Sequence, residues 1–348
     1  MERLLYAERY LNGEQPQWLV KPNMRGRPPV FVQHGFAVHP STSGLGESLM
    51  DRDRNVYVNA HPAKRPERFL RDELEYAKDK ARRLYARHIS EGLVRVDELE
   101  ALLARIPLAA YAEARSLIML VEVGARIKEP ITVAAHSFGA QSALFAAFLR
   151  PDLFPNQGGD KSTLVLLNPA GFTGKRESAE QREESKALAA SEAVRAEREQ
   201  GLLETFRGLG RAGALQLRHL FSVIGAALTR GAEGRRAFKE AILYTATHLL
   251  SGTADSEAHA MANTDMVPYA NFLAASGIRL EIVYDEDDVT FPARVFNARR
   301  EGKEFDERIG FHKTKGKGHF GPVHDPEGTA KLVDDILKNE DSSQGGEK

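Results

Sequence analysis

The segment from Ala135 to Gly139, Ala-His-Ser-Phe-Gly, has the residue pattern with the clearest chemical meaning in this chain. A serine hydroxyl attacks a carbonyl well only when a neighbouring base takes its proton and substrate can reach it. Ala135 and Gly139, two positions to either side of Ser137, are small, which lets a strand turn abruptly into a helix. Such a turn holds the hydroxyl clear of the strand. The pattern matches G-x-S-x-G except for alanine at the first position, and it predicts Ser137 as a nucleophile.

The base that this serine needs is predicted at His319, which follows Gly318 and a basic, flexible loop. The chain has 11 histidines, so position near the end of the chain is not enough to select one. His312 and His324 are the nearby alternatives, and a surface role is favoured for each. These three histidines also suggest a metal site, but they lack the tight helical spacing of a zinc site. We therefore expect no metal.

An acidic partner for the histidine lies within the run from Asp285 to Asp288, Asp-Glu-Asp-Asp. A catalytic triad needs one carboxylate, which orients the imidazole and stabilises its protonated form. At least two of the four acids must therefore belong to a solvated loop. Asp285, at the end of a predicted strand, is one candidate, and the residues alone leave the choice among the four open.

From Pro29 to its last predicted helix, the chain resembles the α/β-hydrolase superfamily. Members place a His-Gly pair after an early strand, a nucleophile on a sharp turn after a middle strand, an acid after a late strand and a Gly-His pair after the last. This chain has all four in that order, at His34-Gly35, Ser137, Asp285 to Asp288 and Gly318-His319. Family members commonly have an aspartate four residues before a proline, as Asp288 stands to Pro292, so the resemblance implies Asp288 as the acid.

The resemblance also implies a reaction and the groups that assist it. It implies a serine hydrolase that cleaves an ester or thioester through an acyl-enzyme on Ser137, with no cofactor. Backbone N–H groups of Phe36 and Phe138 would stabilise the oxyanion. His34, Gly35 and His136 would lie beside the substrate.

Strand patterns alternate with helical ones along the chain, which predicts a mostly parallel sheet flanked by helices, of the eight-stranded α/β-hydrolase type. Short apolar runs bounded by turn residues predict the strands. Apolar residues at three- and four-residue spacing predict the helices. The strands are expected at 4–10, 17–21, 29–33, 55–59, 131–135, 162–167, 278–284 and 308–313, and the helices at 66–87, 96–127 with a break near Pro107, 140–148, 267–275 and 328–338.

Strand patterns stop after the strand 162–167 and resume with the helix 267–275 and the strand 278–284, and the helical patterns between residues 173 and 263 predict an inserted cap. We expect a first core part at 1–172, the cap at 173–263, a second core part at 264–338 and a disordered tail at 339–348. Apolar cap residues could line a substrate pocket and predict an apolar acyl or aromatic group of modest size. They are Phe206, Leu220, Phe221, Ile224 and Tyr244, of which Phe221 and Tyr244 are the candidate substrate contacts.

Composition limits the classes of partner. Lys and Arg number 48 and Asp and Glu 49, giving a net charge of −1, so no strong field favours nucleic acid. The chain has no cysteine, which excludes disulfides and thiolate chemistry and fits the cytoplasm. Its beginning lacks the pattern of a signal peptide, and its apolar runs fall short of the roughly 20 residues that span a bilayer, so we expect a soluble protein. A homo-oligomer stays open.

Three other functions fit the same residues. C–C bond hydrolases and acyltransferases use a similar serine, acid and histidine. A non-catalytic protein could keep the fold and bind a small ligand, although it would not need all three residues. The segment from Gly201 to Arg230 combines apolar and basic residues, and could associate with a membrane surface.

Overall fold

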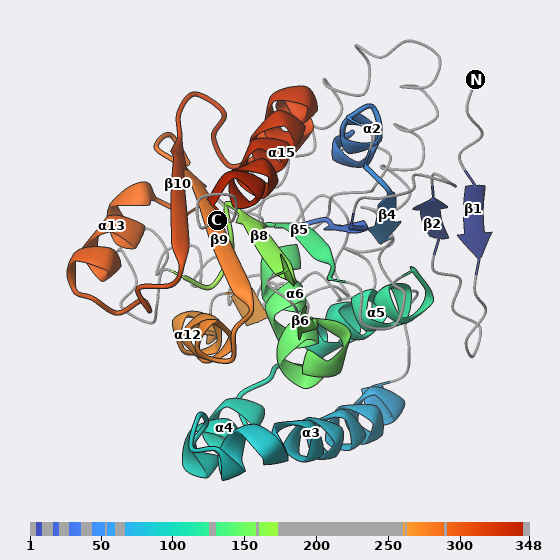
Figure 1. The fold of residues 1–348 in the computed structure, drawn as a ribbon, viewed down its shortest axis with the longest axis vertical. Helices are drawn as coiled ribbons and strands as arrows, with labels where there is room; N and C mark the ends of the chain where they lie inside the picture. Colours follow the sequence, from blue (N-terminus) through green and yellow to red (C-terminus); the bar gives the residue numbers. More distant parts are fainter. Residues whose placement is uncertain are drawn as a thin grey trace, which may run out of the picture.

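The structure is a computed structural model, and it describes residues 5–8, 17–20, 28–35, 44–52, 54–59, 67–124, 130–157, 160–172, 260–261, 263–288 and 291–343 (Figure 1). One large sheet runs through these residues, with helices on both of its faces. The cap predicted at 173–263 falls almost entirely outside the described residues, so its helical structure and its boundaries stay predictions.

The sheet has eight strands in the order β1-β2-β4-β3-β5-β8-β9-β10. The six from β4 to β10 are parallel to one another, whereas β2 pairs antiparallel with β4, and β1 with β2. The predicted mostly parallel sheet is therefore confirmed. The strands are β1 (Leu5–Glu8), β2 (Gln17–Val20), β3 (Val30–Gln33), β4 (Val56–Asn59), β5 (Thr132–His136), β8 (Thr163–Leu167), β9 (Arg279–Asp285) and β10 (Gly310–Thr314).

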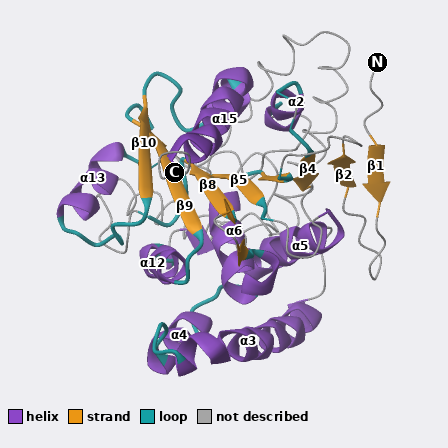
Figure 2. Cartoon of the chain, in the orientation of Figure 1, coloured by secondary structure: helices purple, strands orange, loops and turns teal. Residues whose placement is uncertain are grey.

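Helices cover the two faces of the sheet because its buried strands are apolar on both (Figure 2). Successive side chains of a strand point to opposite faces. Thus Val30 and Val32 of β3 pack in one cluster with α2 (Leu45–Met50) and α15 (Pro326–Ser343), while Phe31 packs in the other. That second cluster includes α5 (Leu108–Gly124), α6 (Phe138–Leu149) and α12 (Val267–Ala275).

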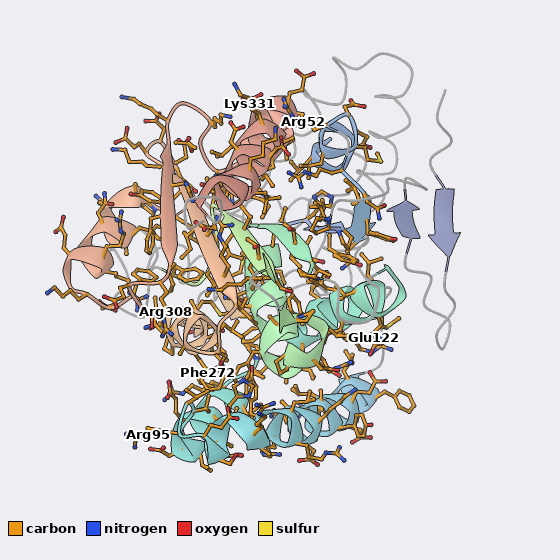
Figure 3. The ribbon with its side chains drawn as sticks, in the orientation of Figure 1. Arg52, Arg95, Glu122, Phe272, Arg308 and Lys331 are labelled. Atoms are coloured by element: carbon orange, nitrogen blue, oxygen red, sulfur yellow. The ribbon has the colours of Figure 1, made fainter. Side chains whose placement is uncertain are left out.

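Two further helices, α3 (Glu67–Ser90) and α4 (Val96–Leu103), form an outer layer on the side of α5, α6 and α12 (Figure 1). Aromatic rings join this layer to the rest. Phe272 of α12 lies between α12 and the α3–α4 layer in Figure 3, with its ring centroid 5.0 Å from that of Tyr85 and 5.1 Å from that of Phe148. The outer layer is therefore part of the same apolar core.

Several elements differ from the sequence prediction. No helix was predicted between the strands 29–33 and 55–59, where α2 lies, or after Pro292, where α13 (Ala293–Glu301) lies. α15 continues to Ser343, so the first residues of the tail predicted as disordered are helical. The short elements η1 (Pro151–Leu153), β6 (Asn156–Gln157), β7 (Asp160–Lys161) and α14 (Gly321–His324) were also not predicted. None of the described helices is both long and apolar enough to cross a membrane.

The described segments on either side of the predicted cap, one ending at Phe172 and the other leading into α12 at Val267, lie together, and we call this place the neck. Arg299 bonds to both segments. The N–H of Met266 donates to the carbonyl of Gly171 at 2.8 Å, so the departing and returning chains lie together. Arg299 of α13 donates to the Phe172 carbonyl at 2.8 Å and to both carboxylate oxygens of Asp265 at 2.9 Å. Its side chain is 10% exposed.

Replacing Arg299 with methionine is expected to lower the free energy of unfolding by about 2–3 kcal/mol, because it removes the donor to the Phe172 carbonyl and leaves the Asp265 carboxylate with the Val267 N–H but without its cation. Arg299 also pairs with Glu304 at 2.7 Å. The expected loss of stability is below that for a fully buried ion pair, because the side chains of Asp265 and Glu304 are 32% and 49% exposed. Denaturant titration measures it. The control is Arg308→Met, which breaks a bidentate pair with Asp306 whose arginine is 55% exposed, and which should change stability by less than about 1 kcal/mol. Equal losses in both variants would contradict the role of Arg299 at the neck.

Candidate active site

Ser137 lies on a sharp turn between β5 and α6, as its sequence pattern predicted. Its backbone has φ 55° and ψ −122°, a left-handed conformation that costs energy for a residue with a Cβ. The turn is held because the Ser137 N–H donates to the Leu167 carbonyl at 3.0 Å and the Ser137 carbonyl accepts from Ala170 at 3.1 Å. Ala135, the departure from glycine, is fully buried in the core, which accommodates its methyl group.

Two glycines let the backbone close around this turn. A Cβ at Gly139 would lie 2.4 Å from the His34 carbonyl oxygen and 2.8 Å from that of Gln33. A Cβ at Gly35 would lie 2.7 Å from the Cβ of Ser137. The His34-Gly35 segment therefore runs directly against the start of α6, where only glycine fits.

Replacing Gly139 with alanine is expected to lower kcat for the reaction proposed below by about 10²–10³-fold, because the new methyl group meets backbone oxygens that cannot rotate away. The start of α6 and the end of β3 must then separate, which displaces the N–H groups expected to bind the oxyanion. Steady-state kinetics on an ester substrate measures the loss. Gly302→Ala, whose Cβ would lie no nearer than 3.3 Å to another residue, is the control. Equal activity in the two variants would contradict this close approach.

The structure brings Ser137, His319 and Asp288 together in one hydrogen-bonded chain. The Ser137 Oγ lies 2.9 Å from Nε2 of His319, and Nδ1 of the same ring lies 2.9 Å from Oδ2 of Asp288. With Asp288 accepting from Nδ1–H, Nε2 is left to accept the serine proton. The residues are 3%, 7% and 3% exposed, respectively. The imidazole is packed among three rings, those of Phe291, Phe320 and His136, at centroid distances of 5.0 Å, 4.9 Å and 5.1 Å.

Asp285, the alternative acid, is engaged elsewhere. Its carboxylate accepts from the N–H of Asp287 at 2.9 Å, the hydroxyl of Thr314 at 2.9 Å and the N–H of Lys317 at 3.2 Å. Burial works to raise the pKa of Asp285, but these hydrogen bonds outweigh it and hold the pKa below its usual range. Asp285 therefore joins the loop after β9 to the loop that leads to His319.

The alternative histidines lie apart from the Ser137 hydroxyl. Nε2 of His312, on β10, lies 2.7 Å from Oε2 of Glu281. His324 ends the short helix α14, and its ring contacts that of Phe320. Within the residues that the structure describes, no group of three histidine and acidic side chains has a geometry that could hold a metal ion.

Only some of the predicted oxyanion and substrate residues lie within the part of the chain that the structure describes. Phe138 occupies the first position of α6, where helix N–H groups have no partner within the helix. Nε2 of His136 lies 2.8 Å from the His319 carbonyl, so this nitrogen donates to the protein. His34 is buried beside Gly35 at the end of β3. Phe36, Phe221 and Tyr244 lie outside the described residues, as do the other apolar cap candidates and the segment from Gly201 to Arg230, so their expected roles stay predictions.

Sequence reasoning missed Asn168, the residue directly after β8. It is 6% exposed, and its side chain bonds to the loops that carry Asp288 and His319. The backbone of Asn168 has φ 43°. The one signal in the sequence is the asparagine itself, directly after a predicted strand, because asparagine tolerates the left-handed region better than most residues.

Comparisons with known proteins support the fold. No family model and no curated protein sequence matches the chain. Among solved structures, it is similar to an α/β hydrolase from a Medee basin deep-sea metagenome library, at 11% identity and a TM-score of 0.55 over 94% of this chain and 95% of that one. It is also similar to an esterase from a Rhodococcus species, at 15% identity and a TM-score of 0.53 over 97% and 99%. A third is a bacterial membrane phospholipase A, at 13% identity and a TM-score of 0.53 over 97% and 86%. At these identities the likeness shows the fold alone.

Proposed function

We propose that this chain, which has the α/β-hydrolase fold, is a serine hydrolase that cleaves an ester or thioester through an acyl-enzyme on Ser137. The observation that carries the proposal is the hydrogen-bonded chain from Ser137 through His319 to Asp288, at the strained turn between β5 and α6. Backbone strain at a buried serine costs free energy, and such strained residues cluster at functional sites. The neighbours of Ser137 support a role as nucleophile.

In the first half of the reaction, His319 takes the Ser137 proton at Nε2 while Oγ attacks the substrate carbonyl carbon. Asp288 accepts from Nδ1–H throughout, which keeps the tautomer and stabilises the imidazolium. The oxyanion that forms would accept from the N–H groups of Phe138 and Phe36, each such donor contributing about 3 kcal/mol. The imidazolium then gives its proton to the leaving alcohol or thiol, and the acyl group stays on Ser137.

In the second half, His319 takes a proton from water, and the resulting hydroxide attacks the acyl-enzyme. The tetrahedral intermediate collapses, the acid leaves, and Nε2–H returns its proton to the Ser137 oxygen. Every proton in this cycle moves through His319, so the chemistry needs no group beyond the chain and water.

The test of this function is labelling by a fluorophosphonate, which phosphonylates activated serines. We expect mass spectrometry to place the adduct on Ser137 and to find none when His319 is replaced by alanine, because the serine then lacks its base. Absence of labelling and of hydrolysis on every ester tried would instead favour a non-catalytic binding protein. Labelling without ester hydrolysis would favour C–C bond cleavage or acyl transfer.

For the substrate, we propose an apolar acyl or aromatic group of small to medium size. With p-nitrophenyl esters from acetate upward, each methylene that becomes buried should raise kcat/KM roughly fourfold, from about 0.8 kcal/mol per CH₂, until the pocket is full. A rise followed by a plateau would measure the depth of the pocket. Flat activity across chain lengths, with preference for charged acyl groups, would contradict an apolar site.

A further inference from the structure

Asn168 links three backbone segments through one side chain that the proposed mechanism does not use. Its Oδ1 accepts from the Asp285 N–H at 3.0 Å. Its Nδ2 donates to the Gly318 carbonyl at 2.9 Å and to the His319 carbonyl at 3.2 Å. One amide therefore joins the end of β8 to the start of the loop that carries Asp288 and to the backbone of His319 itself.

We propose that Asn168 is a positioning residue that sets the geometry of the His319–Asp288 pair; this inference rests on the proposed function. The two loops approach the site from different strands, and neither strand alone determines how the imidazole meets the carboxylate. Asn168 bonds to Asp285, three residues before Asp288, and to the carbonyl of His319 itself, so its contacts lie close to both members of the pair. A shift of about 1 Å in such a pair can cost 10²-fold in rate.

The residue type fits this task. An amide offers an acceptor and two donors on one planar group, which a carboxylate or an aliphatic side chain cannot. The backbone of Asn168 has φ 43°, a conformation that asparagine adopts more readily than most residues with a Cβ. Its N–H donates to the Val283 carbonyl at 2.8 Å, continuing the ladder between β8 and β9, so the side chain starts from a fixed point.

Two other contacts hold the same loop from other directions. His136 donates to the His319 carbonyl at 2.8 Å, so that oxygen accepts from both His136 and Asn168. The carboxylate of Asp285 accepts from the N–H of Lys317, just before Gly318. Asp285 also joins the two loops, but Asn168 is the one among the three whose side chain bonds both to the backbone of His319 and to the start of the loop that carries Asp288. Its loss should therefore change how the imidazole meets the carboxylate.

A second asparagine provides a matched control. Asn271 of α12 donates from Nδ2 to the Glu304 carbonyl at 2.7 Å, and its Oδ1 accepts from the Asp306 N–H at 2.8 Å. It joins backbone segments in the same way as Asn168, but at the loop before β10 and away from the residues of the proposed triad. Replacing either asparagine with aspartate keeps the shape, removes the donor and adds one negative charge, so the added charge is common to both variants.

The experiment compares wild type, Asn168→Asp and Asn271→Asp by two readouts. The first is the rate of fluorophosphonate labelling at Ser137, together with kcat and KM for an ester that wild type cleaves. The second is the downfield proton NMR signal of the His319 Nδ1–H that is bonded to Asp288, assigned by its loss in His319→Ala. For Asn168→Asp we expect labelling and kcat to fall about 10- to 100-fold with KM nearly unchanged, and the NMR signal to shift or broaden. Asn271→Asp should match wild type in both readouts.

Wild-type labelling and an unchanged NMR signal in Asn168→Asp would overturn the proposal, as would equal losses in the two aspartate variants. If wild type itself fails to label, the hydrolase function fails, and the NMR signal still decides whether Asn168 places the His319–Asp288 pair. If Asn168→Asp does not fold, Asn168→Gly replaces it, because glycine accepts the left-handed φ while losing every side-chain bond.

Discussion

Replacing Ser137 with alanine is expected to lower kcat for ester hydrolysis by about 10⁴–10⁶-fold, the range found when a triad nucleophile is removed. The substitution deletes the Oγ that lies 2.9 Å from Nε2 of His319, so no acyl-enzyme can form. Neither the turn nor the proposed oxyanion donors depend on that oxygen, so the protein should fold and bind substrate with little change in KM. Single-turnover and steady-state kinetics on a p-nitrophenyl ester measure the effect.

Ser142 provides the control for this substitution. It lies on α6 just beyond the turn, it is fully buried, and its Oγ donates to the Phe138 carbonyl at 3.4 Å. Ser142→Ala removes a hydroxyl from the same helix without touching His319, so kcat should stay within about twofold of wild type. Activity that survives in Ser137→Ala would show that another group performs the reaction, and it would exclude an acyl-enzyme on this serine.

Replacing Asp288 with asparagine is expected to lower kcat about 10⁴-fold. The amide keeps the shape of the carboxylate, but it cannot stabilise the imidazolium, and its NH₂ group favours the tautomer with the proton on Nε2. That tautomer cannot accept the proton of Ser137. The loss arises because the His319 proton lies on the wrong nitrogen. Activity should therefore recover in part at high pH, where hydroxide can remove the serine proton. A pH profile of kcat from neutral to alkaline conditions measures both effects.

Asp285→Asn is the matched control, since Asp285 is the other acid that the sequence allows. Its lowered folded-state pKa means that its carboxylate contributes stability in full above the ordinary carboxyl pKa of about 3.9, and that this contribution is lost as the pH falls through the lower folded value. Asp285→Asn should therefore lower stability at neutral pH with a much smaller loss of kcat than Asp288→Asn. The reverse ranking of the two variants would assign the acid to Asp285.

Local patterns were sufficient where the decisive contacts are close in sequence. The strand, turn and helix around Ser137 were predicted because apolar β-branched residues, flanking small residues and an alanine-rich run each favour the same local conformation. The break near Pro107 was also predicted and separates α4 from α5, because proline restricts the residue before it. Helices α2 and α13 were missed since their residues lack strong apolar periodicity: α2 contains Gly46, and α13 is rich in arginine.

By itself, the sequence determined the main strands, the longer helices, the parallel sheet, the serine on its turn and the short sets of acids and histidines that could assist it. The tertiary structure decided which members of those sets meet. Asp288 rather than Asp285 contacts His319, and Asn168 contacts residues 117 to 151 positions away. The physical reason is that a hydrogen bond needs two atoms at about 3 Å and in line, which depends on the paths of loops from different strands. Residue propensity and sequence spacing depend on residues close together in the chain, so they do not determine the paths of these loops.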